Sequence, residues 1–469
     1  MSSRSMPLRD WSRPAVSVDP ARADLDAIFR AALTRVDPYR MIVDHLRLDG
    51  SRLVASFEGA CHEEDLDGYD RVLVLGAGKA AARMARAVEQ VLCDRIVGGL
   101  VVVKYGHAER LDRIEIVEAG HPTPDANGVA ASRRIAALAE AADARTLVLI
   151  LISGGGSALL CSPATGSGIP VTLADKQAVT AALLASGADI GAINCVRKHL
   201  SALKGGRLLR LLAPARSLAL ILSDVVGDRL DVIASGLTSP DPTTFAEALE
   251  TLVSYKLRDK VPAPVLRFLE QGADGHLAET VKPHDPILPL TTNCLIGTNL
   301  AALRAACTQA EALGYRPVPL TSTLTGEARE VAKALYAIAR DVRDHGLLAA
   351  RPAFLVAGGE TTVTVTGSGK GGRNQELALA FLVEMARDPL RGQGLHLLSA
   401  ATDGGDGPTD AAGAFASTAS LDRARAAGLS LDAALCDNDS YAFFNAIDGL
   451  LRTGPTLTNV CDLQMVLIR

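Results

Sequence analysis

The segment "RVLVLGAGKAAARMARAVEQ", Arg71 to Gln90, predicts a strand, a tight turn and a helix. Four apolar residues, Val72–Leu75, lead into the turn Gly76–Ala81, and an alanine-rich stretch with helical spacing follows. The turn matches the G-x-G-x-x-G/A pattern with which a doubly wound sheet binds a dinucleotide. Lys79 lies inside this turn, and its charge suggests that the turn could instead serve another anion.

Further strand-like runs on both sides of this segment predict the fold class. Helical, alanine-rich segments separate most of these runs, which are Leu100–Val103, Ile114–Val117, Leu147–Ile152 and Leu218–Leu222. Strands that alternate with helices indicate parallel βαβ units in a three-layer α/β/α arrangement. A second series of the same kind begins near Cys294, and the Thr/Val alternation of 361–366 predicts a half-buried strand or hairpin.

We therefore expect two three-layer α/β/α domains, the N-terminal one Rossmann-like, with an active-site cleft between them. The aperiodic stretch 272–290 marks the boundary. The expected division is a disordered or loosely attached arm over 1–22, an N-terminal domain over 23–280 and a C-terminal domain over 281–469. Helical spacing begins at Ala21 and extends to about Leu48.

The composition excludes several classes of partner. The chain has 469 residues, of which 48% are apolar, and 48 basic residues against 53 acidic ones give a net charge of −5. This balance argues against nucleic acid or an anionic membrane as a partner. The longest apolar run, Leu147–Ile152, is far shorter than the ~20 residues of a membrane helix.

The cysteines and the N-terminus favour a cytoplasmic protein. Eight cysteines are scattered without a C-x-x-C pair, which indicates buried thiols rather than a disulfide framework. The first residues, "MSSRSMPLRDWSRPAV", contain no apolar core of a signal peptide.

Glycine-rich turns follow four of the apolar runs and predict a site for a phosphate-bearing ligand. They are Gly76–Ala81, Ser153–Ser157, Gly358–Gly359 and Thr402–Asp410. Ligands of open α/β sheets bind outside the carboxyl ends of the strands, where such turns lie. Glycine lets backbone amides converge on an anion at the start of a helix.

The residues do not support a plain NAD site or a P-loop. A dinucleotide site requires an acidic residue at the end of the second strand, but "GGLVVVKYGHAE" carries Lys104 there, which leaves only NADP open. In "TVTGSGKGGRNQE", Thr364 replaces the first glycine of the Walker pattern and Gly371 replaces its Ser/Thr.

Charged residues near the glycines suggest phosphoryl transfer. Asp224, Glu360 and Asp403 follow apolar runs, and Arg373 lies where a loop meets a helix. Such residues often serve only as helix caps or turn formers. Phosphoryl transfer, however, requires cations, carboxylates that hold Mg²⁺ and a base. The basic stretch "INCVRKHLSALKGGRL", 193–208, is either a solvated helix face or part of this site.

Eight segments together resemble the glycerate 2-kinase family, which combines a DUF4147 N-terminal domain with a MOFRL C-terminal domain. They run in one order from about residue 25 to the end: "GAGKAAARMA", "GHPTPDANG", "LISGGGSALL", "INCVRKHLSALKGGRL", "SDVVGDRLDVIASGLTSPDPTTF", "GGETTVTVTGSGKGGRNQELAL", "ATDGGDGPTDAAGAF" and "TGPTLTNVCDL". The resemblance implies a phosphotransferase with an alcohol acceptor, which uses ATP and Mg²⁺ (or another divalent cation) to phosphorylate D-glycerate on its 2-hydroxyl. It allows a homodimer.

The resemblance also implies roles for individual residues. Lys79 and Arg373 would contact glycerate and the transferred phosphoryl group, and Asp224 and Asp403 would act as base or metal ligands. The expected substrate- or phosphate-binding residues are Gly76, Gly78, Ser153, Gly154, Gly155, Gly156, Ser157, Asn194, Arg197, Lys198, Glu360 and Asn374.

Two other functions remain open on the residues. Members of the family also carry the name hydroxypyruvate reductase, so an NADP-dependent reductase of hydroxypyruvate or tartronate semialdehyde is one alternative. A non-catalytic sensor that binds a phosphorylated metabolite at Ser153–Ser157 is the other, but it leaves the acidic residues unexplained.

Overall fold

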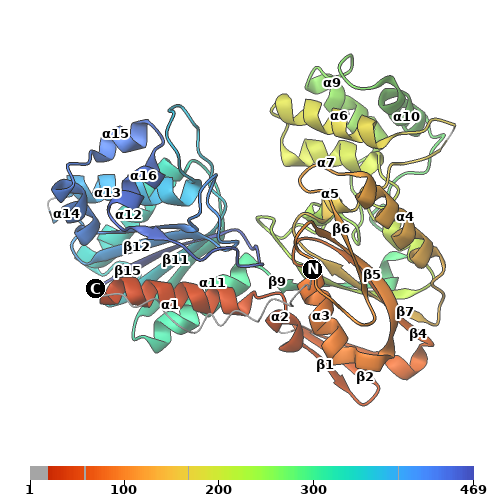
Figure 1. Cartoon of the computed structure of the whole chain (residues 1–469), viewed down its shortest axis with the longest axis horizontal. Helices are drawn as coiled ribbons and strands as arrows, with labels where there is room; N and C mark the ends of the chain where they lie inside the picture. Colours follow the sequence, from red (N-terminus) through yellow and green to blue (C-terminus); the bar gives the residue numbers. More distant parts are fainter. Residues whose placement is uncertain (1–18, 58–59, 167, 389) are drawn as a thin grey trace. The chain divides into compact units, whose positions relative to one another are not determined.

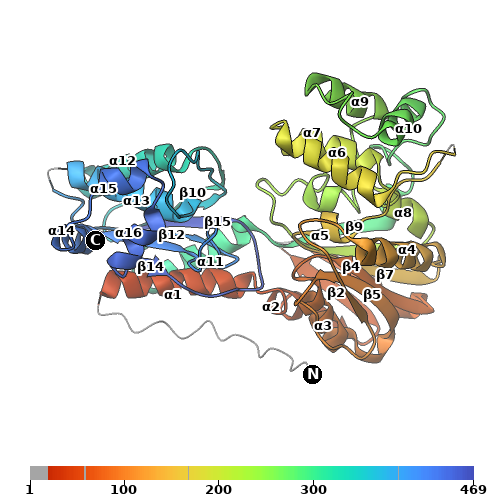
Figure 2. The same cartoon turned by 45° about the horizontal axis from the view of Figure 1, so that its top comes forward.

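The structure is a computed structural model that describes residues 19–57, 60–166, 168–388 and 390–469. The described residues form two compact units, whose elements are labelled in Figures 1 and 2. The first unit contains 38–223 and 228–296, and the second contains 19–37, 224–227 and 297–469. Each unit contains a six-stranded sheet, which confirms the predicted α/β class.

Two elements lie in a different unit from the one expected by chain order. Helix α1 (Pro20–Arg35) belongs to the second unit, where it packs on α11 (Asn299–Ala312), and Asp24 accepts a 2.6 Å hydrogen bond from the Tyr315 hydroxyl. Strand β9 (Thr291–Gly297) forms an edge of the first unit's sheet. Residues 1–18 of the expected arm lie outside the described residues.

Helix α1 is also shorter than predicted. It begins at Pro20 because the Asp19 side chain caps it, accepting a hydrogen bond from the Ala21 amide, and proline fits the first turn. It ends at Arg35, and the short helix α2 (Arg40–Val43) follows. The remainder of the expected helix is the strand β1 (Leu46–Asp49).

The sheet of the first unit has the order β6-β5-β4-β7-β8-β9. Its other strands are β4 (Arg71–Ala77), β5 (Ile96–Lys104), β6 (Glu115–Ala119), β7 (Thr146–Ile152) and β8 (Arg216–Leu222), which pair in parallel as predicted. Counted along the chain this order is 3-2-1-4-5-6, the order of doubly wound dinucleotide-binding sheets. The strand order therefore reverses between β4 and β7, where ligands of such sheets bind.

Helices and a second, smaller sheet complete the first unit. Strand β7 is buried over all seven residues, as expected for a parallel strand covered on both faces. The helices are α3 (Ala81–Leu92), α4 (Ala126–Glu140), α5 (Gly156–Leu159), α6 (Leu173–Ala185), α7 (Ile190–His199), α8 (Arg207–Leu212), α9 (Phe245–Ser254) and α10 (Ala263–Ala273). An antiparallel sheet that we did not predict joins β1, β2 (Arg52–Phe57) and β3 (Ala60–Asp65).

The sheet of the second unit is mixed rather than parallel. Its order is β10-β11-β15-β12-β13-β14, with β10 (Arg316–Leu324), β11 (Ala353–Gly359), β12 (Leu395–Ala401), β13 (Gly413–Ser417), β14 (Leu450–Leu451) and β15 (Asp462–Ile468). Only β10 and β11 pair in parallel, and β15 lies antiparallel between β11 and β12. The remaining helices are α12 (Ala328–His345), α13 (Arg373–Arg387), α14 (Thr418–Ala426), α15 (Leu431–Cys436) and α16 (Ser440–Ala446).

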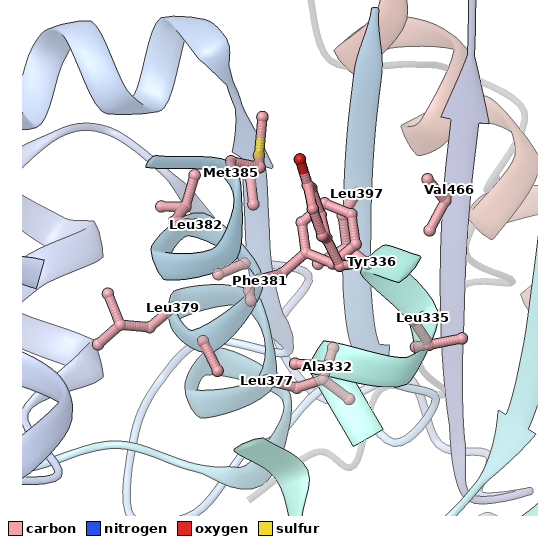
Figure 3. Close-up of a cluster of buried hydrophobic side chains, with 14 of the residues drawn as sticks. Ala332, Leu335, Tyr336, Leu377, Leu379, Phe381, Leu382, Met385, Leu397 and Val466 are labelled. Carbon is pink, nitrogen blue, oxygen red and sulfur yellow. The ribbon is translucent and has the colours of Figure 1, made fainter. Parts of the chain in front are cut away.

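The core of the second unit lies between this sheet and helices α12 and α13. Figure 3 shows Tyr336 of α12 and Phe381 of α13 beside Leu397 of β12, with Val466 of β15 nearby. The two rings meet edge to face, with centroids 5.2 Å apart. Helix α13 is buried around most of its circumference, so its first residue, Arg373, has a firmly held backbone. Among the described helices, none has the length and apolar character needed to span a bilayer.

Candidate active site

Two of the glycine turns meet in the first unit, where the strand order reverses. The turn after β4 and the turn after β7 are joined by a hydrogen bond from the Lys79 amide to the Gly154 carbonyl, 2.9 Å. The Ala80 amide donates to the Ser153 hydroxyl at 3.1 Å. Gly78 has φ +145°, and a Cβ on it would overlap the Ser153 hydroxyl. The fingerprint glycine thus permits contact between two loops, a role that requires no dinucleotide.

The Lys79 ammonium has no hydrogen-bond or ion-pair partner within the described residues. Its backbone carbonyl contacts Nδ1 of His107 at 3.0 Å. Lys104, at the end of β5, and Lys79 both act electrostatically on His121, which follows β6. This edge of the sheet is therefore suited to an anion.

His121, which we did not predict as a site residue, packs on the turn after β7. Gly155 has φ +86°, and a Cβ on it would lie 2.9 Å from Cδ2 and 3.0 Å from Nε2 of the His121 ring. Partial burial, together with the charges of Lys79, Lys104 and His107, lowers the pKa of His121 to about 4. The imidazole is therefore neutral at pH 7. His121 lies in the segment "GHPTPDANG", one of those that resemble the glycerate 2-kinase family, and this segment could have marked it as a site residue.

A chain of hydrogen bonds connects the turn after β7 to helix α7. The hydroxyls of Ser157 and Ser235 lie 2.7 Å apart, and Ser235 donates to Asn194 Oδ1 at 3.1 Å. Arg197, one helical turn beyond Asn194, is partly exposed and has no hydrogen-bond or ion-pair partner in the part of the chain that the structure describes. Asn194 and Arg197 are thus near the predicted turn, on one helix.

Most of the basic stretch 193–208 is buried, so the interpretation as a solvated helix face is wrong. Lys198 is 2% exposed, and its Nζ atom forms an ion pair with Asp241 Oδ1 at 3.2 Å. His199 is fully buried and contacts Glu279 at 3.1 Å. Lys204 donates to the Leu160 carbonyl at 2.8 Å, and burial places its pKa well below the usual value. The Lys198 ammonium, predicted as a ligand contact, is thus buried and paired with a carboxylate of the protein.

In the second unit, strand register brings Arg373 and several carboxylates together. Asp462, the first residue of β15, lies opposite Gly359 on one side and Ala401 on the other. Glu360 directly follows β11 and Asp403 lies two residues beyond the end of β12, so both lie at the same edge of the sheet.

Arg373 is held in this cluster by two acidic residues. Its Nε and Nη2 atoms donate hydrogen bonds to the Asp462 carboxylate at 2.5 and 2.8 Å, and its Nη1 atom lies 2.9 Å from Glu360 Oε1. Burial raises the pKa of Asp462, against the effect of Arg373. Asp462 was missed because an isolated Asp before the apolar run of "NVCDLQMVLI" indicates only the start of a strand.

Asp224 and Asp403 act on the same group. Partial burial raises the pKa of Glu360, Arg373 lowers it, and the negative charges of Asp462, Asp224 and Asp403 raise it. The Asp403 carboxylate also accepts a hydrogen bond from the Gly405 amide at 2.9 Å. Four of the predicted residues thus share one electrostatic site: Arg373, Glu360, Asp224 and Asp403.

Asn374 of α13 is buried beside this site, where its side chain interacts with Asp462. It is fully buried, accepts a 2.6 Å hydrogen bond from Ser399, and its amide donates to Asp406. Asp406 also accepts from the Gln375 amide at 2.9 Å, so its carboxylate occupies the N-terminus of α13. Asn374 therefore positions the start of the helix that carries Arg373.

A cavity of about 720 Å³ in the second unit borders Arg373 and Glu360. The stretch 361–366, predicted as strand or hairpin, is instead a loop along this cavity, with a single bridge from Thr362 to Glu327. Val363 and Val365 supply apolar lining, and the buried Thr361 hydroxyl has no hydrogen-bond partner in the described residues.

Side chains of the protein occupy several backbone amides at the start of the adjoining glycine-rich loop. The amides of Gly367 and Ser368 donate to Asn438 and Asp437 at 2.9 and 2.8 Å, and the Lys370 amide donates to Asp439 at 3.2 Å. These donors are therefore occupied by protein side chains.

The carboxylates at Arg373 have the chemistry of a Mg²⁺ site without forming a complete one. Among the described residues, no group of three or more His, Cys, Asp or Glu side chains is spaced to hold a metal ion. Mg²⁺ in phosphoryl-transfer enzymes is commonly held by one or two carboxylates together with substrate phosphates. Asp224 and Asp403 fit that type of site.

Two family models and several known proteins match the chain. A model described as a domain of unknown function, DUF4147, matches residues 24–270, and the MOFRL family model matches 353–462. The glycerate 2-kinase of Pyrococcus horikoshii is 38% identical over 440 residues, which are 93% of this chain and 95% of that relative. A protein of Agrobacterium vitis named as a hydroxypyruvate reductase is 42% identical over 455 residues, which are 96% and 94%.

The fold also matches a solved structure. The crystal structure of glycerate kinase from Thermotoga maritima has a TM-score of 0.81 and 39% identity, covering 94% of this chain and 98% of that one. Fold and charged sites define an α/β phosphotransferase that does not use a P-loop. The chain belongs to the glycerate 2-kinase family. Hydroxypyruvate reductase is an alternative label for some relatives of this family.

Proposed function

We propose that this chain transfers the γ-phosphoryl group of ATP to the 2-hydroxyl of D-glycerate, with 2-phospho-D-glycerate and ADP as products. The observation that carries the proposal is the similarity, along nearly the whole chain, to the glycerate 2-kinases of Pyrococcus horikoshii and Thermotoga maritima. The charge distribution of the two units supports it, since one site is cationic and the other is mainly acidic.

In this proposal the acceptor binds to the first unit. Lys79 and Arg197 are cations without protein partners in the described part of the chain, and a 2-hydroxy acid brings a carboxylate that can pair with them. Arg197 suits a carboxylate because its planar guanidinium donates two parallel hydrogen bonds. The serine hydroxyls at 153 and 157 shape the turn beside Lys79.

ATP and a divalent cation bind to the second unit in the same proposal. Asp224 and Asp403 would hold Mg²⁺, which offsets charge on the phosphate oxygens when bound. Arg373, oriented by Asp462 and Glu360, directs its remaining N–H groups at the transferred phosphoryl group. The cavity of about 720 Å³ is far larger than glycerate requires, and its valines suit the nucleoside.

The decisive experiment is ³¹P NMR of the full chain with ATP, Mg²⁺ and D-glycerate. We expect a 2-phosphoglycerate signal that grows as ADP appears. A 3-phosphoglycerate signal would retain a kinase with another acceptor position. If no new phosphoester forms and the protein oxidises NADPH in the presence of hydroxypyruvate, the kinase proposal is wrong and the reductase alternative is supported.

A further inference from the structure

His121 packs on the turn after β7, beside the proposed acceptor site. Its ring lies on the left-handed residue Gly155, where any side chain would meet Nε2 and Lys79 Cγ at 3.0 and 3.4 Å. The missing Cβ therefore leaves space between the imidazole and the lysine. Neither ring nitrogen has a hydrogen-bond partner within the described residues. A half-buried imidazole without a partner is available to a ligand.

The charges that act on His121 belong to groups that are cationic when protonated, and the nearby Asp125 carboxylate is engaged by the Gly120 amide. Lys79 lies on the turn after β4, Lys104 ends β5, and His107 follows that strand. Protonation of His121 would add a further positive charge to this cluster. The imidazole consequently remains neutral and keeps a free acceptor lone pair.

We propose that His121 is the catalytic base for the acceptor hydroxyl, with Nε2 accepting its hydrogen bond and then its proton. The inference rests on the proposed function. The hydroxyl oxygen forms a bond to the γ-phosphorus, the bond from this phosphorus to the β–γ bridging oxygen breaks, and ADP departs. The proton passes from the hydroxyl to Nε2 and then to solvent. In this arrangement Asp224 and Asp403 would hold the cation and are not needed as the base.

The surroundings make His121 a suitable base for an anionic substrate. Its pKa of about 4 is that of an ordinary aspartate, the base that protein kinases use. A carboxylate at this position would repel both the glycerate carboxylate and the phosphoryl group. A neutral imidazole supplies the same basicity without that repulsion.

The first test compares His121→Gln with His276→Gln, a matched change at an exposed histidine of the same unit. Glutamine keeps polarity but cannot act as a base. We expect kcat of His121→Gln to fall about 100-fold, the low end for loss of a general base. The KM for ATP and the calorimetric affinity for glycerate should stay close to wild type, as should all constants of His276→Gln. A kcat above one third of wild type in His121→Gln, or lost glycerate affinity with unchanged kcat, would overturn the proposal.

The second test does not depend on turnover. Chains labelled with ¹⁵N-histidine are titrated by NMR, with His121→Gln to assign the signal. His121 should titrate near pH 4, and Lys79→Met should raise this midpoint because one neighbouring cation is lost. A midpoint near 6.5 that Lys79→Met leaves unchanged would refute the inference even if the protein phosphorylates glycerate. A midpoint near 4 in a protein that lacks kinase activity would overturn the proposed function instead.

Discussion

Asp462 binds Arg373 through two hydrogen bonds, and it does so from a fully buried position at the start of β15. The second unit thereby fixes the direction of a guanidinium that is otherwise partly exposed. Strand β15 lies between β11 and β12 and runs antiparallel to both. Its first residue therefore lies at the edge of the sheet where β11 and β12 end and their following loops begin.

Replacement of Asp462 by Asn should weaken the two hydrogen bonds that orient the Arg373 guanidinium. Loss of one partner of a buried pair costs about 3 kcal/mol, so the free energy of unfolding should fall by that amount in urea titrations. Asp422→Asn is the control, because its pair with Arg391 is exposed and should contribute at most about 0.5 kcal/mol. We also expect kcat to fall in Asp462→Asn alone. Equal stability of the two variants would contradict this account.

Removal of Lys79 or Arg373 should abolish turnover, and Arg373→Ala should also lower stability because it leaves the buried Asp462 carboxylate without its cationic partner. Each cation offsets phosphoryl or substrate charge in the proposed reaction, and neither side chain forms part of a hydrophobic core. Coupled ADP assays of Lys79→Ala and Arg373→Ala measure activity, and circular dichroism measures folding. Lys333→Ala, an exposed lysine paired with Glu330, should behave as wild type. Wild-type activity in both site variants would refute their roles.

Gly155→Ala should lower both stability and activity. The left-handed backbone at φ +86° costs an alanine about 1–2 kcal/mol, and the new methyl group would displace His121. Gly187→Ala has similar strain at φ +74° but nothing within 4 Å, so it should lose only stability. Thermal unfolding and kcat of both variants separate the two effects. A fully active Gly155→Ala would show that the ring position is immaterial.

Val365→Trp should raise the KM for ATP without a change for glycerate. The larger side chain would occupy the cavity of the second unit, and a loss of about 1.4 kcal/mol in nucleotide binding corresponds to about tenfold in KM. Val97→Trp is the matched control at an exposed valine of β5. An unchanged KM for ATP in Val365→Trp would place the nucleoside elsewhere.

The pH dependence of stability should report the lowered pKa of His121. Between pH 6.5 and about 4 the unfolded chain binds a proton at this histidine that the folded chain does not, so this contribution to folding is present above pH 6.5 and declines toward pH 4. His121→Gln should remove that component, so its stability should fall less from pH 7 to pH 5 in denaturant titrations. The same decline in both proteins would mean that His121 has an ordinary pKa in the folded state.

Local sequence patterns predicted much of the fold and several site residues. The apolar runs located β4 to β8 because a parallel strand buried on both faces needs uninterrupted Val, Ile and Leu. The glycines marked the turns, and the position of Lys79 inside one of them indicated an anion site. The alternation of 361–366 was misleading, because a loop along a cavity also presents apolar and polar residues in turn.

By itself the sequence determined the strands β4 to β8 and the glycine turns that follow several of them, since these depend on neighbouring residues. Only the tertiary structure decided which charges are occupied. Lys198 pairs with Asp241, 43 positions away, while Lys79 remains available to a ligand. Likewise, Asp462 meets Arg373, 89 positions earlier, through an antiparallel strand that spacing along the chain does not reveal. Pairing of buried charges depends on strand register and burial, and both arise only when distant segments pack together.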